Sequence, residues 1–481
     1  MSTRYHRTPT TGTARSTFTR TVGMTRKGRS PRRWSVLAGT AAASLTLAAC
    51  STLPLAGDNT VVLNYWLWDS AQLPGYRQCA AAFQEENPDI EVQITQFGWG
   101  DYWMQITATM VAEAAPDVFT NHTGQFGKYA ELGQLLDLEP YIERDNFDLS
   151  IYNDGLADQW LNEAGTGRYG IPKDWDTEAL FYNEEMIAEA GYTSEDLWNL
   201  TWNPQDGGSF EALIAHLTVD KNGVRGDEPG FDKNNVAVYG MGYNEAGAGY
   251  GQVQWSAFAL SNGQWTWSDK NPWGRTFQYD DPDFKETISW YIGLIEKGYM
   301  PPLSVASSGI GTLESLGTGA YAMIVEGSWN VAGIAKSSAV PVQVAPTPIG
   351  PDGNRASVMN GLADSVFVGT KHPEEAWEWV KFLGSTKCQD IIAEQAVVFP
   401  AISSSSDKAV DAFEKIGFDA TAFSVHIEDG TGVPSPVVDR WAALDSIMNP
   451  AMSAIFMFEK DVDSLDQATA EVNAMMSRGR Q

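Results

Sequence analysis

Basic residues, cysteine and histidine are all scarce in this sequence. Its 481 residues contain 32 Lys and Arg against 61 Asp and Glu, with three Cys and five His. An acidic surface repels polyanions, so we expect no nucleic-acid partner, and an anionic ligand such as a sugar phosphate is disfavoured unless a local basic pocket binds it. The histidines after His6 show no metal-ligand spacing, so we expect no bound metal. They are His122, His216, His372 and His426.

Acidic residues are absent from residues 1–49, which contain nine Arg or Lys. An apolar run of small residues, Trp34–Ala49, follows the basic part, a pattern typical of a signal peptide and short for a membrane span. The run ends Leu-Ala-Ala-Cys at Cys50, which resembles a bacterial lipobox. We expect cleavage before Cys50, a diacylglycerol on its thiol and a lipidated tether over residues 50–57. The alternatives are an ordinary signal peptide or a membrane anchor. The proportions of the leader indicate Met24 as the true start.

Motifs that mark common catalytic centres are also missing. The chain has no Gly-x-Ser-x-Gly, no His-Glu-x-x-His, no P-loop and no Gly-x-Gly-x-x-Gly turn, which argues against an enzyme and against a nucleotide cofactor. An exported glycosidase is the alternative, because it needs only two carboxylates about 5–10 Å apart. The 61 acidic residues can supply such a pair, but no motif selects one. We therefore expect neither catalytic residues nor cofactors.

Tryptophan, by contrast, is abundant. The chain has 18 Trp and is 11% aromatic. Indole buries a large apolar area in protein cores, and it also stacks on the apolar C–H faces of sugar rings. Loss of the nine basic residues of the leader changes the formal charge from −29 to −38. A neutral sugar is indifferent to this charge, whereas a polyamine is attracted by it, so both ligand classes stay open.

The length exceeds the size at which one hydrophobic core stops growing, so we expect two lobes. A buried strand at Val61–Trp68, a helix at Tyr76–Asn87 and an alternating strand at Ile90–Ile94 predict a parallel α/β unit. Gln264–Trp267 alternates like a hairpin strand. Asp220–Asp232 is rich in Asp and Gly but lacks the glycine and glutamate of an EF-hand at the required spacing. We interpret it as a solvated insertion, with a calcium loop as the alternative.

Five segments together carry a resemblance to a known family. They are Ala115–Phe119 (APDVF), Gly133–Tyr141 (GQLLDLEPY), Tyr169–Asn183 (YGIPKDWDTEALFYN), Tyr321–Trp329 (YAMIVEGSW) and Lys371–Trp377 (KHPEEAW). In this order after a lipobox, they resemble the extracellular solute-binding proteins of bacterial sugar ABC importers, the family that includes maltose-binding protein. Tyr169–Asn183 resembles the first crossover between the two lobes of that family. The resemblance covers nearly the whole chain after Cys50.

The resemblance implies an α/β, two-lobed type II periplasmic-binding-protein fold with a ligand cleft between the lobes. The first lobe would comprise residues 58–175 and 356–400, and the second 176–355 and 401–481. Lobe closure around a neutral sugar or oligosaccharide would capture it for an ABC permease powered by a cytoplasmic ATPase. We therefore expect a monomeric lipoprotein, extracytoplasmic and anchored to the cell membrane. A polyamine or other non-sugar solute is the alternative ligand.

The residues expected at the ligand follow from matches to the family pattern. They are Trp68, Asp69, Asn121, Gln125, Asp174, Asp176, Asn244, Trp255, Trp329 and Asn360. Trp faces would stack on sugar rings, and Asp, Asn and Gln side chains would bind hydroxyls. Trp329 and Asp176 match the family best. Asn121 stands where maltose-binding protein has an indole, and Gly124–Gln125 replaces an Asp-Arg pair, which argues against maltose itself.

Two cysteines are left once Cys50 is lipidated, Cys79 and Cys388, an even pair in an exported protein. Both lie on helical patterns, and alignment with the family places both helices in the same lobe. The resemblance therefore implies a disulfide between Cys79 and Cys388, with two buried free thiols as the alternative.

Overall fold

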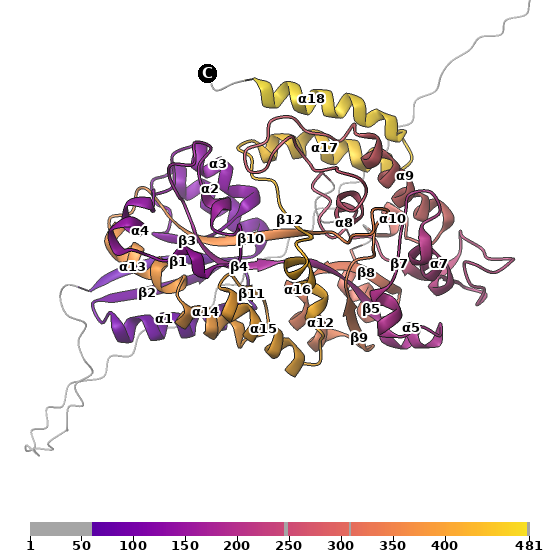
Figure 1. Cartoon of the computed structure of the whole chain (residues 1–481), viewed down its shortest axis with the longest axis horizontal. Coiled ribbons are helices and arrows are strands. Elements are labelled where there is room, and N and C mark those ends of the chain that lie inside the picture. Colours follow the sequence, from indigo (N-terminus) through magenta and orange to yellow (C-terminus); the bar gives the residue numbers. More distant parts are fainter. Residues whose placement is uncertain (1–59, 245–248, 307–308, 479–481) are drawn as a thin grey trace, which may run out of the picture. The chain divides into compact units, whose positions relative to one another are not determined.

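The computed structural model describes residues 60–244, 249–306 and 309–478 (Figure 1). The expected signal peptide, the lipobox with Cys50 and the tether lie outside these residues. Two β-sheets with helices packed on them organise the described chain. Within the described ranges, no helix combines the length and the apolar character that crossing a membrane requires.

The larger sheet has seven strands, in the order β11-β4-β10-β3-β1-β2, with β12 also paired to β10. Its strands are β1 (Val61–Leu67), β2 (Ile90–Gln96), β3 (Val118–His122), β4 (Ile171–Asp176), β10 (Ser357–Val366), β11 (Phe399–Pro400) and β12 (Gly432–Pro434). Strand β1 is parallel to both β2 and β3, which confirms the expected parallel unit. Strand β10 runs antiparallel to its neighbours β3 and β4.

Helices cover both faces of the larger sheet (Figure 1). They are α1 (Leu73–Glu86), α2 (Trp99–Val111), α3 (Thr123–Glu131), α4 (Glu139–Asp145), α13 (Pro373–Leu383), α14 (Thr386–Ala393) and α15 (Ser403–Lys415). Alternation along β1 explains why two layers form, since successive side chains of a strand point to opposite faces. Leu63 and Tyr65 pack in the cluster that contains α1 and α13, whereas Trp66 and Trp68 pack in the cluster that contains α2.

The smaller sheet has five strands, in the order β6-β7-β8-β5-β9. They are β5 (Glu178–Asn183), β6 (Val219–Asp220), β7 (Val236–Met241), β8 (Tyr321–Gly327) and β9 (Val342–Ala345). Every residue of β5 and β8 is buried. Leu180 and Val325 contribute to one apolar cluster, and Phe181 and Ile324 to another. Because both faces are covered, these strands are nearly continuous apolar runs in the sequence.

The remaining helices connect or cover the strands of the smaller sheet and the C-terminal region. They are α5 (Glu184–Glu189), α6 (Ser194–Trp198), α7 (Gly208–Leu217), α8 (Ser256–Leu260), α9 (Pro282–Lys297), α10 (Leu303–Ala306), α11 (Thr312–Gly317), α12 (Val331–Ser337), α16 (Thr421–Glu428), α17 (Trp441–Phe456) and α18 (Leu465–Ser477). Short 3₁₀ turns include η3 (Ser328–Asn330), directly after β8.

The chain passes from the larger sheet to the smaller one at Thr177, between β4 and β5. It returns at β10, where Ser357 Oγ accepts a hydrogen bond of 2.8 Å from the backbone of Glu178. The resemblance implies that all of 401–481 belongs to the second lobe, but α15 packs on β11 and α14, which belong to the larger sheet and its helices. The physical reason is aromatic packing: the ring centre of Phe413 on α15 lies 5.2 Å from that of Phe399 on β11.

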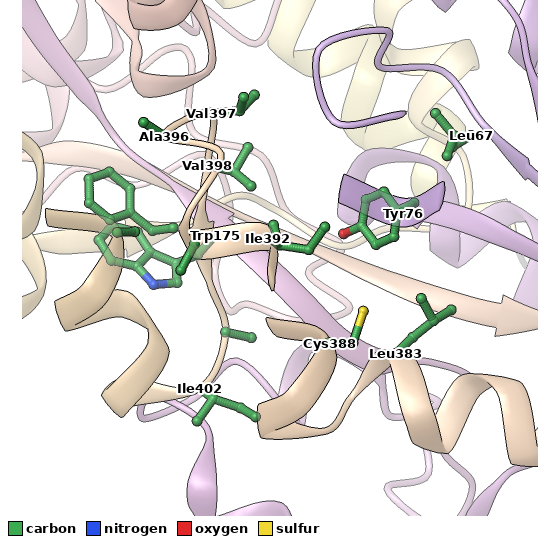
Figure 2. Packing of buried hydrophobic residues seen from close by; sticks show 14 of the residues in the cluster. Leu67, Tyr76, Trp175, Leu383, Cys388, Ile392, Ala396, Val397, Val398 and Ile402 are labelled. Atoms are coloured by element: carbon green, nitrogen blue, oxygen red, sulfur yellow. The ribbon is translucent and has the colours of Figure 1, made fainter. Parts of the chain in front are cut away.

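Trp175 shows how the core beside the crossover is built (Figure 2). Its indole stacks on Phe399 with ring centres 4.5 Å apart, and its Nε1 donates to Ser406 Oγ at 2.9 Å. Close by, Cys388 on α14 forms the expected disulfide with Cys79 on α1, with Cα atoms 5.2 Å apart. The bond joins two helices whose cysteines are 309 residues apart in the sequence.

The hairpin strand expected at Gln264–Trp267 does not form in the structure. Trp265 and Trp267 are each only 2% exposed and lie in the core of the smaller sheet. Their indole N–H groups donate to the carbonyl oxygens of Gln278 and Tyr250, respectively. A buried indole needs such an acceptor, and here loop carbonyls provide it, so the alternation reflects packing of a loop.

Candidate ligand-binding site

Three carboxylates alternate along the crossover from β4 to β5: Asp174, Asp176 and Glu178. Alternate strand positions share a side, and Trp175, between the first two, points into the core instead. The three residues are buried, with exposed fractions of 1%, 7% and 0%. Glu326 on the neighbouring strand β8 is also buried, at 4%. The passage between the sheets therefore gathers four buried carboxylates.

A series of side-chain hydrogen bonds starts at Asp176. Asn360 on β10 donates its Nδ2 to Asp176 Oδ1 at 2.8 Å, and the Tyr250 hydroxyl donates to Asn360 Oδ1 at 2.8 Å. Asp176 and Asn360 belong to the larger sheet, whereas Tyr250 packs with the core of the smaller sheet. The series thus joins groups from the two halves of the fold, and it satisfies both ends of the Asn360 amide.

The two glutamates, Glu178 and Glu326, accept hydrogen bonds from residues in the half of the fold that contains the smaller sheet. Glu178 accepts from the backbone N–H of Val253 at 3.0 Å and from Ser256 Oγ at 3.2 Å, just at the start of α8. Glu326 accepts from Asn244 Nδ2 at 2.9 Å and from the backbone N–H of Gly327 at 2.9 Å. All of these donors are neutral.

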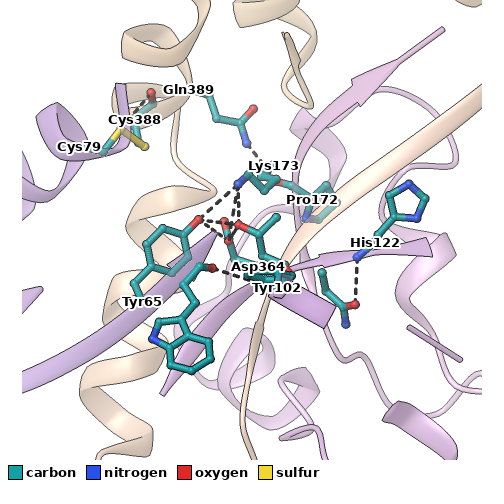
Figure 3. A network of polar contacts seen from close by, with 12 residues as sticks. Tyr65, Cys79, Tyr102, His122, Pro172, Lys173, Asp364, Cys388 and Gln389 are labelled. Carbon is teal, nitrogen blue, oxygen red and sulfur yellow. Dashed lines mark hydrogen bonds and ion pairs between the residues drawn. A yellow bond between two sulfur atoms is a disulfide. The ribbon is translucent and has the colours of Figure 1, made fainter. Parts of the chain in front are cut away.

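Lys173, the residue before Asp174, lies in a buried polar network (Figure 3). Lys173 Nζ donates to Thr120 Oγ1 at 2.9 Å and to the Tyr65 hydroxyl at 3.3 Å, and it lies 3.9 Å from Asp364 Oδ1. Tyr65 in turn donates to Asp364 at 2.7 Å. The network joins side chains of β1, β3, β4 and β10, so the ammonium group of Lys173 is held among these four strands.

Burial and mutual repulsion raise the pKa values of the four carboxyl groups. Burial raises the pKa of Asp174 to about 7, against the opposing charge of Lys173. Burial raises the pKa of Glu178 to about 8 and that of Glu326 to about 7. The pKa of Asp176 is also well above its usual range because of burial, and the charges of the other three carboxylates raise it further. These effects reflect a desolvated group of like charges.

An aromatic cluster adjoins the end of β1. Trp68 is partly buried, and its ring centre lies 5.1 Å from that of Trp99 and 5.3 Å from that of Trp103. Trp99 is 51% exposed although it also contacts the His122 ring at 5.6 Å. Burial lowers the pKa of His122 to about 4, so this ring is neutral at pH 7. The cluster presents an indole surface without a formal charge.

The structure brings together some of the predicted site residues. Asp174, Asp176, Asn244 and Asn360 belong to the carboxylate group or bind it. Trp329 lies in η3, two residues after Gly327, and its ring covers that glycine so closely that a Cβ there would clash with it.

Three further predicted residues lie at the end of β1 and on α3. Trp68 joins the aromatic cluster described above. Asp69 accepts from the backbone N–H of Ala71 at 2.7 Å. Gln125 is partly buried in the first turn of α3.

Two predicted residues are directed into internal packing instead. Trp255 is fully buried, with its ring against Trp265 and Phe284 in the core of the smaller sheet. Asn121 is also fully buried: it donates to Ser365 Oγ at 3.1 Å and accepts from the backbone of His122. The reason is the same for both, because residues distant in the sequence already contact these two side chains in the interior.

Glu178, Glu326 and Tyr250 belong to the candidate site by their hydrogen bonds but are absent from the list predicted from the sequence. Glu178 could have been found, because it continues the alternation of Asp174 and Asp176 by one more step. Glu326 directly precedes the Gly-Ser-Trp match to the family. Tyr250 has no comparable local signal, because its partner Asn360 is 110 residues away.

The Asp220–Asp232 loop is organised by its own first residue. Asp220 is 1% exposed, and its carboxylate accepts backbone N–H groups of Asn222, Val224 and Asp232 at 2.8–3.0 Å. These bonds hold the pKa of Asp220 below its usual range. Both oxygens of this carboxylate accept backbone hydrogen bonds, which stabilise the turn.

The two sheets, the crossovers and the polar group between them define a two-lobed α/β binding-protein fold. The family described as bacterial extracellular solute-binding protein matches residues 78–415, and the chain belongs to this family. Its place in this family makes it an extracytoplasmic binding protein and not an enzyme, which removes the glycosidase alternative.

Known relatives cover nearly the whole chain. The galactooligosaccharide-binding protein of Bacillus subtilis is 25% identical over 438 residues, which are 88% of this chain and 91% of that protein. The crystal structure of UspC from M. tuberculosis is 26% identical with a TM-score of 0.69, covering 86% of this chain and all of that one. The Listeria monocytogenes substrate-binding protein Lmo0181, in complex with cycloalternan, shares the fold with a TM-score of 0.72 at 20% identity, over 87% and 99% of the two chains.

Proposed function

We propose that this protein is the substrate-binding lipoprotein of an ABC importer and captures a sugar or oligosaccharide at the crossover carboxylates. The observation that carries the proposal is the series Asp176–Asn360–Tyr250, which joins groups from both halves of the fold beside buried carboxylates. Carboxylate and amide groups bind sugar hydroxyls strongly, and neutral indoles such as Trp99 suit the apolar faces of sugar rings. Relatives named for galactooligosaccharides, and one in complex with cycloalternan, support a carbohydrate ligand.

Capture would work by closure of the two lobes. Asn360 and Tyr250 come from different halves, so a ligand that contacts both is bound fully only when the halves are close together. A ligand with this differential affinity shifts the population toward the closed state. The closed form would then deliver the sugar to a membrane permease driven by a cytoplasmic ATPase. The lipobox at Cys50 supports a lipid anchor that keeps the protein beside this permease.

A thermal-shift screen of the chain from Ser51, against neutral and amine-bearing monosaccharides and oligosaccharides, tests the ligand class. A sugar that raises the melting temperature and is recovered intact by chromatography supports the proposal. If no sugar raises it, or if the sugar is cleaved, the proposal is wrong. Lipidation is tested separately by labelling cells with radioactive palmitate. Label in the wild-type protein and none in Cys50→Ser is the expected result, and label in both would contradict an anchor at Cys50.

A further inference from the structure

None of the four crossover carboxylates forms a salt bridge within the described residues, and Lys173 pairs with Asp364 instead. Asp176, Glu178 and Glu326 accept only from amide, hydroxyl and backbone N–H groups. The ammonium group of Lys173, whose charge opposes the rise of the Asp174 pKa, donates its hydrogen bonds to Thr120 and Tyr65. Burial raises the pKa of all four carboxyl groups because their ionised forms are costly without a counter-charge. A ligand that brings positive charge would stabilise these ionised forms.

A second observation concerns buried polar atoms without a hydrogen-bond partner at or next to these carboxylates and their partners. Asp174 is 1% exposed, and apart from the side chain of Gln72, which lowers its pKa, no donor among the described residues reaches its oxygens. Two residues that follow hydrogen-bond partners of these carboxylates in the sequence also have a buried polar atom without a partner. Gln254, which follows the Val253 that binds Glu178, has a buried Oε1 without a partner. Ser328, which follows Gly327, has a fully buried Oγ without one.

These unpartnered groups indicate which hydrogen-bonding groups a ligand at this site must have. An ionised carboxylate and an amide oxygen only accept hydrogen bonds, so a ligand that partners Asp174 in its ionised form and Gln254 must donate. An ammonium group donates three hydrogen bonds and accepts none. Its positive charge also offsets the repulsion among Asp174, Asp176, Glu178 and Glu326. A hydroxyl donates a single hydrogen bond and brings no charge, so it meets this demand less well.

We propose that the ligand is a saccharide that carries a protonated amine, and that its ammonium group binds between Asp174 and Asp176. This inference rests on the proposed capture of a saccharide and replaces the neutral sugar expected from the sequence with an amino sugar. The uncharged indoles of Trp68 and Trp99 provide a surface for the sugar ring, which a linear polyamine does not need.

Matched pairs of sugars that differ only in one amine test the proposal by calorimetric titration of the whole chain from Ser51. The probes are glucosamine with glucose, galactosamine with galactose, and a chitosan trimer with cellotriose, together with spermidine. At least one amino sugar should bind ten times more tightly than its hydroxyl partner. This advantage should shrink in high salt, because it is electrostatic.

Two variants locate the amine. Asp174→Asn and Asp176→Asn each remove one charge and keep the shape, and both should reduce the advantage of the amino sugar at least tenfold while the neutral partner is affected less. Asp352→Asn removes one charge from an exposed loop residue and should preserve the advantage, as the matched control. Neutralising a buried carboxylate should not prevent folding, which the melting temperature of each variant verifies.

The outcomes distinguish the amino-sugar proposal from the broader proposal that the protein captures a saccharide. If neutral sugars bind as tightly as amino sugars, or if none of the amino sugars binds, the amine proposal is overturned while saccharide capture can still hold. If spermidine binds and every sugar fails, both proposals are overturned. If Asp352→Asn abolishes the preference as strongly as Asp174→Asn, the overall charge of the protein, and not the crossover site, is responsible.

Discussion

Asn360 on β10 and Asp176 on β4 are joined side chain to side chain, with Asn360 Nδ2 2.8 Å from Asp176 Oδ1. The opposite end of the same amide accepts from Tyr250. Both residues of the pair are buried, Asn360 at 1% and Asp176 at 7% exposure. One amide therefore orients a carboxylate and a phenol that the two halves of the fold contribute.

Asn360→Ala should weaken binding of the sugar identified in the screen by at least tenfold, because Asp176 and Tyr250 lose their common partner. The free energy of unfolding should fall by about 1–3 kcal/mol, the usual cost of unsatisfied buried polar groups. Calorimetry and urea denaturation measure the two effects. Asn234→Ala, in an exposed loop, is the control and should change neither. Unchanged affinity in Asn360→Ala would show that the pair plays no part in binding.

The ligand-free protein should become more stable as the pH falls from 8 to 6.5. The carboxyl pKa values of Asp174, Glu178 and Glu326 are raised to about 7, 8 and 7. A raised carboxyl pKa gives stability that is present at low pH and lost as the pH rises through the folded-state value. Scanning calorimetry of the ligand-free chain should show a higher melting temperature at pH 6.5 than at pH 8.

The double variant Asp174→Asn/Glu178→Gln should flatten this dependence, because it removes two of the groups that bind protons. Below pH 6.5 the trend should weaken in every variant. Burial lowers the pKa of His122 to about 4 and that of His426 to about 3, so the unfolded chain then gains protons at these residues. A wild-type melting temperature that falls between pH 8 and 6.5 would contradict the assignment of raised pKa values.

Removal of the disulfide in Cys79→Ser/Cys388→Ser should lower the free energy of unfolding by about 3–5 kcal/mol. The bond closes a loop between residues 309 positions apart, and a long closed loop restricts the unfolded chain strongly. Urea denaturation with and without a reductant measures the effect. Reductant should destabilise the wild type but leave the double variant unchanged. If reductant affects both equally, the destabilisation has another origin.

Lys173→Met should destabilise the protein by about 3–5 kcal/mol, because it leaves the Asp364 carboxylate buried without its cation. The double variant Lys173→Met/Asp364→Leu removes both charges and should recover much of the loss. Urea denaturation of the two variants measures this coupling. Equal loss in single and double variants would indicate that packing of the Lys173 chain, and not charge pairing, provides the stability.

Trp99→Ala should reduce affinity for the sugar by about three- to tenfold, the magnitude expected for one aromatic contact. Met104→Ala is the control, because Met104 is also exposed, at 63%, on the same helix. Titration followed by calorimetry compares the two variants. Equal affinity in both would mean that the exposed indole of Trp99 does not contact the ligand.

Local patterns in the sequence determined much of this fold. The apolar alternation or runs of β1, β5 and β8 can be recognised from neighbouring residues alone. The period of the apolar residues and the length of each run predict that these strands are buried. The order of family segments identified the crossover at Asp174 and Asp176. The pairing of Cys79 with Cys388 also followed once the family placed both helices together.

Tertiary structure alone decided which polar and aromatic groups meet at the site. Trp255 and Asn121 have side chains typical of a sugar site, yet Trp265, Phe284 and Ser365 occupy their surfaces. Tyr250 gains its role only through Asn360, 110 residues further along the chain. An isolated sequence shows the chemistry of a side chain, but its exposure and partners depend on long-range packing, and these decide whether it serves the core or the ligand.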